Sequence, residues 1–262
     1  MHGKITVFFL VVIFPMWKFL YQMASPKSFF RLTQSWLRCL GIAAIALLLT
    51  GMVWGLFFAP PDYQQGDAFR IIYIHVPAAF MSMAIYSLMT FCALLLIVWQ
   101  IKIAGLILSA SAPIGASMAF IALLTGSMWG KPMWGTWWVW DARLTSELVL
   151  LLLYAAIMAV NSAFQGRNQS DKAVALLTLV GVIDLPIIHY SVYWWNTLHQ
   201  GATLTAFAKP KIALPMLYPL LLTLTGFALY CFWLILHRAG NTLLIREKKQ
   251  NWVRKIYEGG QL

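Results

Sequence analysis

The sequence predicts an all-α integral membrane protein with six transmembrane helices. Hydrophobic residues make up 61% of the 262 residues and charged residues only 10%, whereas a soluble domain carries about 25% charged residues. The mean hydropathy is +0.75, and charge-free runs are long enough for the roughly 20 residues that cross a bilayer core as a helix. The net charge of +11 belongs to the segments between these runs and not to a soluble basic domain, so we expect no nucleic-acid partner and a lipid bilayer as the surroundings.

Runs without Asp, Glu, Lys or Arg place the spans in chain order. Five runs are free of these residues, and a sixth is interrupted only by Asp184: 39–61, 71–101, 103–130, 148–166, 212–237 and 173–190. We therefore expect spans at about 40–58, 77–99, 106–128, 146–164, 173–190 and 214–236. Because their number is even, both termini are expected on the same side of the membrane.

The distribution of Lys and Arg predicts which side that is. Of the 19 Lys and Arg residues, 14 lie in the terminal segments and the two short loops, and 5 lie in the three long loops. Positively charged residues favour the cytoplasmic side. We expect cytoplasmic termini and outward-facing loops at about 59–76, 129–145 and 191–213. The chain then divides into an N-terminal cytoplasmic segment (1–37), a membrane domain (38–237) and a basic cytoplasmic tail (238–262).

The apolar run Ile5–Trp17 is too short for a span. Its length is typical of the apolar part of a signal peptide, and it is equally consistent with an extension that precedes a start at Met16.

The segment 129–143 is expected to be an outward-facing loop at the membrane surface, and it has an unusual density of tryptophans. Five of the 13 tryptophans fall within it: Trp129, Trp134, Trp137, Trp138 and Trp140. Trp is enriched at membrane interfaces, but an interfacial belt explains one or two residues per loop. Aromatic contacts contribute about 0.5–1.5 kcal/mol per pair beyond burial, so several indoles together favour a site for a large, flat, apolar ligand.

Histidines flank this loop in the predicted fold. His75 precedes the second span, His189 ends the fifth, and His199 lies in the third long loop. An interfacial polar role is the common alternative for a single histidine. Two imidazoles on opposite sides of a metal ion place their nitrogens roughly 4 Å apart, and we expect His75 and His199 to do so.

Charged residues near the loop have candidate roles of their own. Arg70 and Arg143 suit paired carboxylate oxygens such as the two propionates of haem, with membrane-surface anchors as the alternative. Asp141 precedes Ala142 and is expected to cap the fourth span. Asp184 lies inside a span, where a carboxylate is costly and often functional, and the sequence leaves open a proton-linked role or a capped buried group. Pro186 is expected to kink that span.

Cysteine spacing excludes one type of haem attachment. The three cysteines are far apart and form neither C-x-x-C nor C-x-x-C-H, so no covalent haem attachment site is expected.

The residues 134–141, Trp-Gly-Thr-Trp-Trp-Val-Trp-Asp, match the pattern W-G-x-x-W-x-W-D of haem-handling membrane proteins. Trp129 and Trp137 lie outside the specified positions and fit interface anchors as well. Four more stretches strengthen the likeness: Ala59–Gly66, Tyr73–Ala79, Leu185–Val192 and Trp194–Gly201. From about Met16 to the last span the chain resembles the CcmC family of the bacterial cytochrome c maturation system. CcmF and the CcsA-type synthetases share the pattern but are much larger, so six spans fit CcmC best.

This resemblance implies a function and a set of partners. In the family, haem b is bound without covalent attachment at the periplasmic face of the inner membrane, by one histidine from the first outer loop and one from the third. By match these are His75 and His199, with the tryptophan loop as the platform. The family passes haem to the periplasmic chaperone CcmE and works beside CcmA, CcmB and CcmD. We expect a transfer platform and not an enzyme. The alternatives are a transporter of haem or another small molecule and a structural assembly subunit.

Overall fold

The computed structural model describes residues 25–164, 167–199 and 212–259. Over these residues six helices are long and apolar enough to cross a membrane, which confirms the predicted all-α class and the number of spans. The elements in chain order are α2 (Pro26–Val53) with its π-helical continuation η1 (Trp54–Phe58), the 3-10 helix η2 (Asp67–Ile71), α3 (Ile72–Trp99), α4 (Lys102–Trp134), α5 (Ala142–Ala163), α6 (Arg167–Gly181), α7 (Asp184–Trp194), α8 (Leu214–Arg246) and α9 (Asn251–Tyr257). The run Ile5–Trp17 and residues 200–211 of the third long loop lie outside the described residues.

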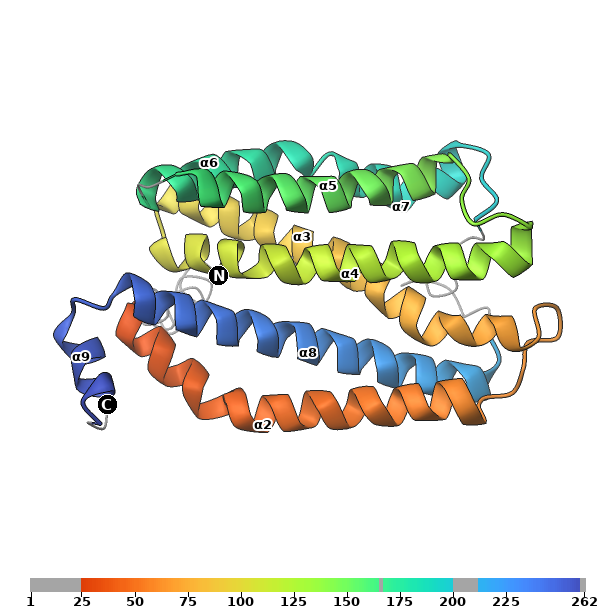
Figure 1. The fold of residues 1–262 in the computed structure, drawn as a ribbon, viewed down its shortest axis with the longest axis horizontal. Coiled ribbons are helices and arrows are strands. Elements are labelled where there is room, and N and C mark those ends of the chain that lie inside the picture. The colour runs from red at the N-terminus through yellow and green to blue at the C-terminus, as the bar shows by residue number, and fades with distance from the viewer. Residues whose placement is uncertain (1–24, 165–166, 200–211, 260–262) are drawn as a thin grey trace, which may run out of the picture.

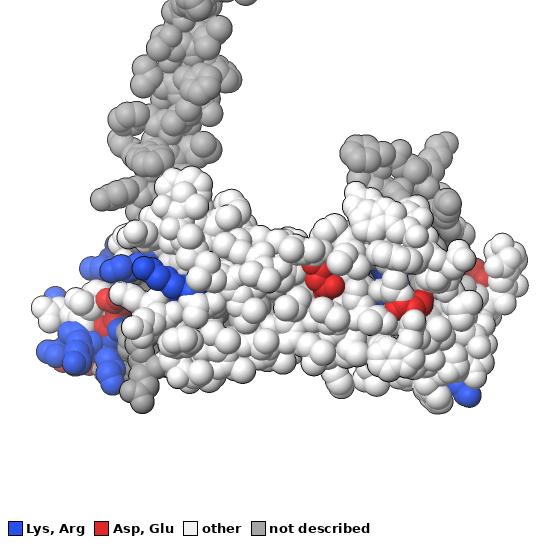
Figure 2. Space-filling model, turned by 90° about the horizontal axis from the view of Figure 1, so that it is seen from above, with Lys and Arg blue, Asp and Glu red and all other residues white. Residues whose placement is uncertain are grey.

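The spans form an elongated bundle in which consecutive spans run in opposite directions. Figure 1 shows α5, α6 and α7 on one side, the pair α2 and α8 on the other, and α3 and α4 between them. One end of the bundle, here called the α4–α5 end, holds the last turn of α4, the first turns of α3 and α5 and the last turn of α7. The opposite end, the α9 end, holds the start of α2 and the whole of α9. Lys and Arg gather at the α9 end on the face shown in Figure 2.

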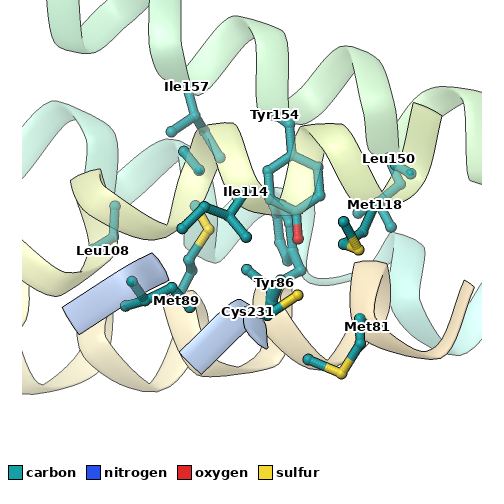
Figure 3. Close-up of a cluster of buried hydrophobic side chains, with 14 of the residues drawn as sticks. Met81, Tyr86, Met89, Leu108, Ile114, Met118, Leu150, Tyr154, Ile157 and Cys231 are labelled. Atoms are coloured by element: carbon teal, nitrogen blue, oxygen red, sulfur yellow. The ribbon is translucent and has the colours of Figure 1, made fainter. Parts of the chain in front are cut away.

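The centre of the bundle is packed around two buried tyrosines. Tyr86 of α3 and Tyr154 of α5 meet edge to face with ring centroids 5.3 Å apart, and both side chains are fully buried (Figure 3). The Tyr154 hydroxyl donates to the carbonyl oxygen of Ser82 at 2.7 Å. A Cβ at Gly115 would lie 2.2 Å from Cζ of Tyr154. The absence of a side chain at Gly115 therefore makes room for the tyrosine that joins α3, α4 and α5.

An ion pair fixes helix positions at the α9 end. Arg246 of α8 donates to both carboxylate oxygens of Asp171 in α6, at 2.8 and 2.9 Å. The Asp171 side chain is 10% exposed. Paired hydrogen bonds to a carboxylate are among the stronger polar contacts in proteins, so this pair ties α8 to α6.

The predicted loop at 129–143 is shorter in the structure, which corrects its first boundary. Helix α4 continues through Lys131 and Pro132 to Trp134, and it ends at Gly135 with φ of 76°. The Gly135 N–H donates to the carbonyl oxygen of Lys131 at 3.1 Å, as is usual where a left-handed glycine ends a helix. Trp129 and Trp134 are thus helical, and only residues 135–141 connect α4 to α5.

The fifth span is broken close to Pro186, where the sequence predicts a kink. Helix α6 ends at Gly181 and α7 begins at Asp184. Proline has no N–H to donate to the carbonyl four residues earlier, and that carbonyl, of Val182, accepts from Leu185 at 3.1 Å instead. The segment boundaries predicted at 37/38 and 237/238 both fall inside helices, α2 and α8. The charged residues next to these two boundaries remain part of α2 and α8, because their side chains reach water while the backbone continues as a helix.

Candidate functional site

A cavity of about 100 Å³ lies at the α4–α5 end of the bundle. Its walls come from the first turns of α3 and α5, the last turns of α4, and the segment after α7. The lining residues are Gln65, His75, Ala79, Ala122, Leu123, Gly126, Ser127, Trp129, Gly130, Met133, Trp134, Arg143, Leu144, Glu147, Leu198 and His199. Five of the ten predicted site residues are among them: His75, Trp129, Trp134, Arg143 and His199.

The two predicted histidine ligands face each other across this cavity. The ring centroids of His75 and His199 are 6.3 Å apart, and their planes differ by 38°. A metal ion bound to both rings by bonds of about 2 Å would hold the ring centres roughly 6 Å apart, once half a ring is added on each side. The separation therefore fits one metal ion between the two imidazoles.

Hydrogen bonding fixes the orientation of His75. This residue lies in the first turn of α3, and its Nδ1 is 3.0 Å from the carbonyl oxygen of Ala122 and 3.2 Å from Oγ1 of Thr125. A carbonyl oxygen only accepts, so we assign the ring proton to Nδ1. The lone pair is then on Nε2, the other ring nitrogen. Metal-binding histidines commonly donate their second nitrogen to a backbone carbonyl in this way.

Two tryptophans in the last turns of α4 stand beside the imidazoles. Trp129 contacts His75 edge to face with centroids 5.7 Å apart, and its Nε1–H donates to Oε1 of Gln65 at 2.9 Å. Trp134 lies 6.4 Å from His199, centroid to centroid. Because α4 stays helical as far as Trp134, both indoles are directed toward the histidines.

The other predicted tryptophans lie outside the cavity wall. Trp138 and Trp140 form an edge contact at 5.4 Å, while Trp137 is 56% and Trp140 76% exposed. The Nε1 of Trp138 is buried and has no hydrogen-bond partner among the described residues. None of these three indoles lines the cavity.

The two arginines and Asp141 differ in their placement. Asp141 caps α5 as predicted, with Oδ1 accepting from the Leu144 N–H at 2.8 Å. Arg143 lines the cavity and donates from Nη1 to the carbonyl oxygen of Ile188 in α7 at 3.0 Å. Arg70 does not line the cavity; it pairs with Asp67 at 2.9 Å and donates to the carbonyl oxygen of Leu56 at 2.9 Å.

Sequence reasoning did not assign Glu147 to the site. This carboxylate lines the cavity, is 8% exposed, and accepts from the Ser82 hydroxyl at 2.8 Å. Its signal in the sequence is its position four residues after Arg143, which puts both side chains on one face of α5. Gln65, the partner of Trp129, was missed as well: the stretch Ala59–Gly66 contributed to the resemblance, but nothing in it singled out the glutamine as a site residue.

Two residues that the sequence left open do not line the cavity. His189 is exposed and contacts the ring of Tyr190. Asp184 begins α7 at the helix break, and its Oδ2 is buried without a hydrogen-bond partner among the described residues.

The fold and the site define a multi-pass helical membrane protein in which two imidazoles face each other across an aromatic cavity. Residues 19–254 match the family model described as heme exporter protein C. Over 241 residues the chain is 51% identical to heme exporter protein C of Haemophilus influenzae, covering 92% of this chain and 98% of the relative. The same protein of Escherichia coli K12 is 51% identical with 92% and 97% coverage, and that of Rhodobacter capsulatus is 36% identical with 88% and 96% coverage. The chain belongs to the heme exporter protein C family, CcmC.

Proposed function

We propose that this protein is a haem-binding platform in the membrane that passes haem to the chaperone CcmE during c-type cytochrome biogenesis. The observation that carries the proposal is the pair of imidazoles, His75 and His199, at a separation that fits one iron atom. The name shared by the relatives, heme exporter protein C, supports haem as the ligand. Haem b is then the cargo of the site and is held without a covalent bond.

The surrounding residues have definite tasks in this proposal. His75 and His199 would each hold the haem iron through one ring nitrogen, and the carbonyl of Ala122 holds the His75 ring in place. Trp129 and Trp134 would pack against the macrocycle. Arg143 donates from one nitrogen to the Ile188 carbonyl. Its other N–H groups suit a propionate oxygen.

The size of the cavity affects how haem could be released to a second protein. The space between the described side chains is about 100 Å³, whereas sites that enclose a drug-sized ligand measure roughly 300–1,000 Å³. A macrocycle of the size of haem would therefore extend beyond this space, and part of it would remain exposed. A ligand held in this way remains accessible to a second protein. The platform needs no nucleophile of its own, because the chaperone supplies the histidine that takes the haem.

We propose that the α4–α5 end faces the periplasm and the α9 end the cytoplasm of a bacterial inner membrane. The gathering of Lys and Arg at the α9 end supports this orientation (Figure 2). Arg70, which donates to the Leu56 carbonyl in η1, then lies at the periplasmic surface. The ABC-type subunits CcmA and CcmB and the small protein CcmD complete the proposed assembly.

A reporter fusion tests the orientation. Alkaline phosphatase joined after Thr136, in the connection between α4 and α5, should be active because it reaches the periplasm. A fusion after Gln100, in the turn between α3 and α4, should be inactive. The reverse pattern would contradict the proposed orientation.

One observation favours transport as a second candidate function. The broken span between α6 and α7 carries the buried carboxylate of Asp184, and transporters often place polar groups at broken helices within the membrane. The histidine pair lies at one end of the bundle, and Asp184 does not line the cavity between the two rings, which favours the platform.

Delivery of haem to the chaperone separates the two functions. In a strain that lacks its own copy of this protein, covalent haem on the chaperone is measured after denaturing electrophoresis, with haem supplied directly to the periplasmic side of spheroplasts. The platform predicts that labelling still requires this protein, because haem must be bound and positioned. Labelling that no longer requires it would favour the transporter.

A further inference from the structure

Three residues from two distant segments form a hydrogen-bond chain that ends on the backbone of His199. The Thr197 hydroxyl donates to Oδ2 of Asp141, 56 residues earlier in the chain. The same oxygen, Oγ1 of Thr197, accepts from the backbone N–H of His199 at 3.0 Å. One hydroxyl thus connects the capping residue of α5 to the residue that faces His75.

The first member of this chain is held firmly. Asp141 is 9% exposed, and its Oδ1 accepts from the N–H of Leu144 in the first turn of α5. Two residues further on, Arg143 joins the same turn to the carbonyl oxygen of Ile188 in α7. The start of α5 is therefore a fixed point on which the segment after α7 can be positioned.

The segment that carries His199 has no regular secondary structure of its own. Helix α7 ends at Trp194, and residues 195–199 follow without helix or strand. Trp195 and Leu198 are 50% and 56% exposed, so packing restrains this segment only weakly. Polar contacts with α5 thus have a large share in deciding where the His199 ring lies.

We propose that Thr197 is a positioning residue for His199, and that Asp141 acts on the site through Thr197 rather than by contact with haem. The threonine hydroxyl suits this task because it donates to a carboxylate and accepts from an N–H at the same time. Serine retains both bonds, whereas valine has the same shape and forms neither. The inference rests on the proposed function, since it concerns the geometry of a haem ligand.

The expected effect follows from what the loss of this hydroxyl leaves behind. Without it, the His199 N–H and one oxygen of Asp141 lose their partner, and the segment 195–199 loses its bond to α5. Mutation of groups that orient metal ligands typically costs 10–100-fold in affinity. We expect a loss of this size in haem affinity, with part of the bound haem carrying only the His75 imidazole.

The test compares Thr197→Val with Thr197→Ser in the full-length protein, purified in detergent and titrated with haem. Thr225→Val is the control, because its exposed hydroxyl donates within α8 to the Leu221 carbonyl. The visible spectrum reports the low-spin fraction, in which both imidazoles bind iron. Thr197→Val should lower this fraction and raise the haem dissociation constant 10–100-fold, free imidazole should restore the low-spin spectrum, and Thr197→Ser and the control should match the unchanged protein.

A second variant keeps the test decisive where Thr197→Val does not fold. Asp141→Ala removes the oxygen that accepts from Thr197, together with the oxygen that caps α5. It should show the same loss of low-spin haem as Thr197→Val, in a protein that elutes normally from a sizing column.

Two contrary results have different meanings. If His199→Ala abolishes the low-spin spectrum while Thr197→Val and Asp141→Ala leave spectrum and affinity unchanged, the positioning role is wrong and the proposed haem site stands. If His199→Ala itself leaves the spectrum unchanged, the ligand assignment fails and the role of Thr197 fails with it.

Discussion

Replacement of Gly126 by alanine should weaken haem binding without weakening the fold. Gly126 lies in α4 beside the ring of His75, and a Cβ there would be 3.0 Å from Cε1 of that ring, closer than the ordinary contact range of 3.4–4 Å. The ring must therefore move away by a few tenths of an ångström. Such a movement turns it from its rotamer and lengthens its bond of 3.0 Å to the Ala122 carbonyl.

The size of the effect follows from this contact. Haem binding requires the His75 ring to return to its original position against the new Cβ, and one extra methyl group in a packed site costs about 1–3 kcal/mol. Since 1.4 kcal/mol corresponds to about tenfold in affinity, the haem dissociation constant should rise about tenfold. Alanine is also favoured over glycine inside a helix by about 1 kcal/mol, so the unfolding midpoint of the haem-free protein should not fall.

Haem titration and thermal unfolding of Gly126→Ala measure the two effects separately. Gly240→Ala is the matched control, because this glycine lies inside a helix, α8, does not line the cavity, and has Nε2 of Gln34 at 3.1 Å, a flexible chain end, as its nearest side-chain atom. The control should bind haem normally. An unchanged haem dissociation constant for Gly126→Ala would refute the reasoning that the position of the His75 ring determines binding.

Two further predictions concern single hydrogen-bonded pairs. Asp171→Asn should lower the unfolding free energy by about 1.5–3 kcal/mol, because one carboxylate oxygen that accepts from Arg246 is lost; thermal unfolding in detergent measures this, and an unchanged midpoint would contradict a structural role for the pair. Trp129→Phe should weaken haem binding by about 1 kcal/mol, roughly fivefold, through loss of the bond to Gln65, and Trp129→Ala should weaken it more because the ring is lost as well. Equal affinities of the two Trp129 variants would show that the ring itself contributes nothing.

The spans were predictable from the sequence because the bilayer imposes a simple rule on charge. Runs without charged residues predicted six spans, and six helices of suitable length are present among the described residues. Their ends were less predictable. Charge at Lys131 suggested the end of a helix, but the backbone stays helical until Gly135 adopts a left-handed conformation. A glycine at the end of a helix was the better signal.

The site was predictable only in part, because its residues differ in how they are positioned. His75, Trp129 and Trp134 stand out by residue type and by their place beside a span. The contacts that hold the site do not: Ser82 and Glu147 are 65 residues apart, and Asp141 and Thr197 are 56 apart. Such pairs depend on how α3, α5 and the segment after α7 are aligned along their axes. Hydropathy and charge fix which segments are helices but leave this alignment undetermined.

The most direct test of the central claim is the visible spectrum of the haem-loaded protein and of three histidine variants. We predict a low-spin spectrum typical of two axial imidazoles for the unchanged protein and for His189→Ala, whose ring is exposed and does not line the cavity. The low-spin spectrum should be lost in His75→Ala and in His199→Ala, because each removes one iron ligand. Retention of that spectrum in either variant would contradict the assignment of His75 and His199 as the two ligands.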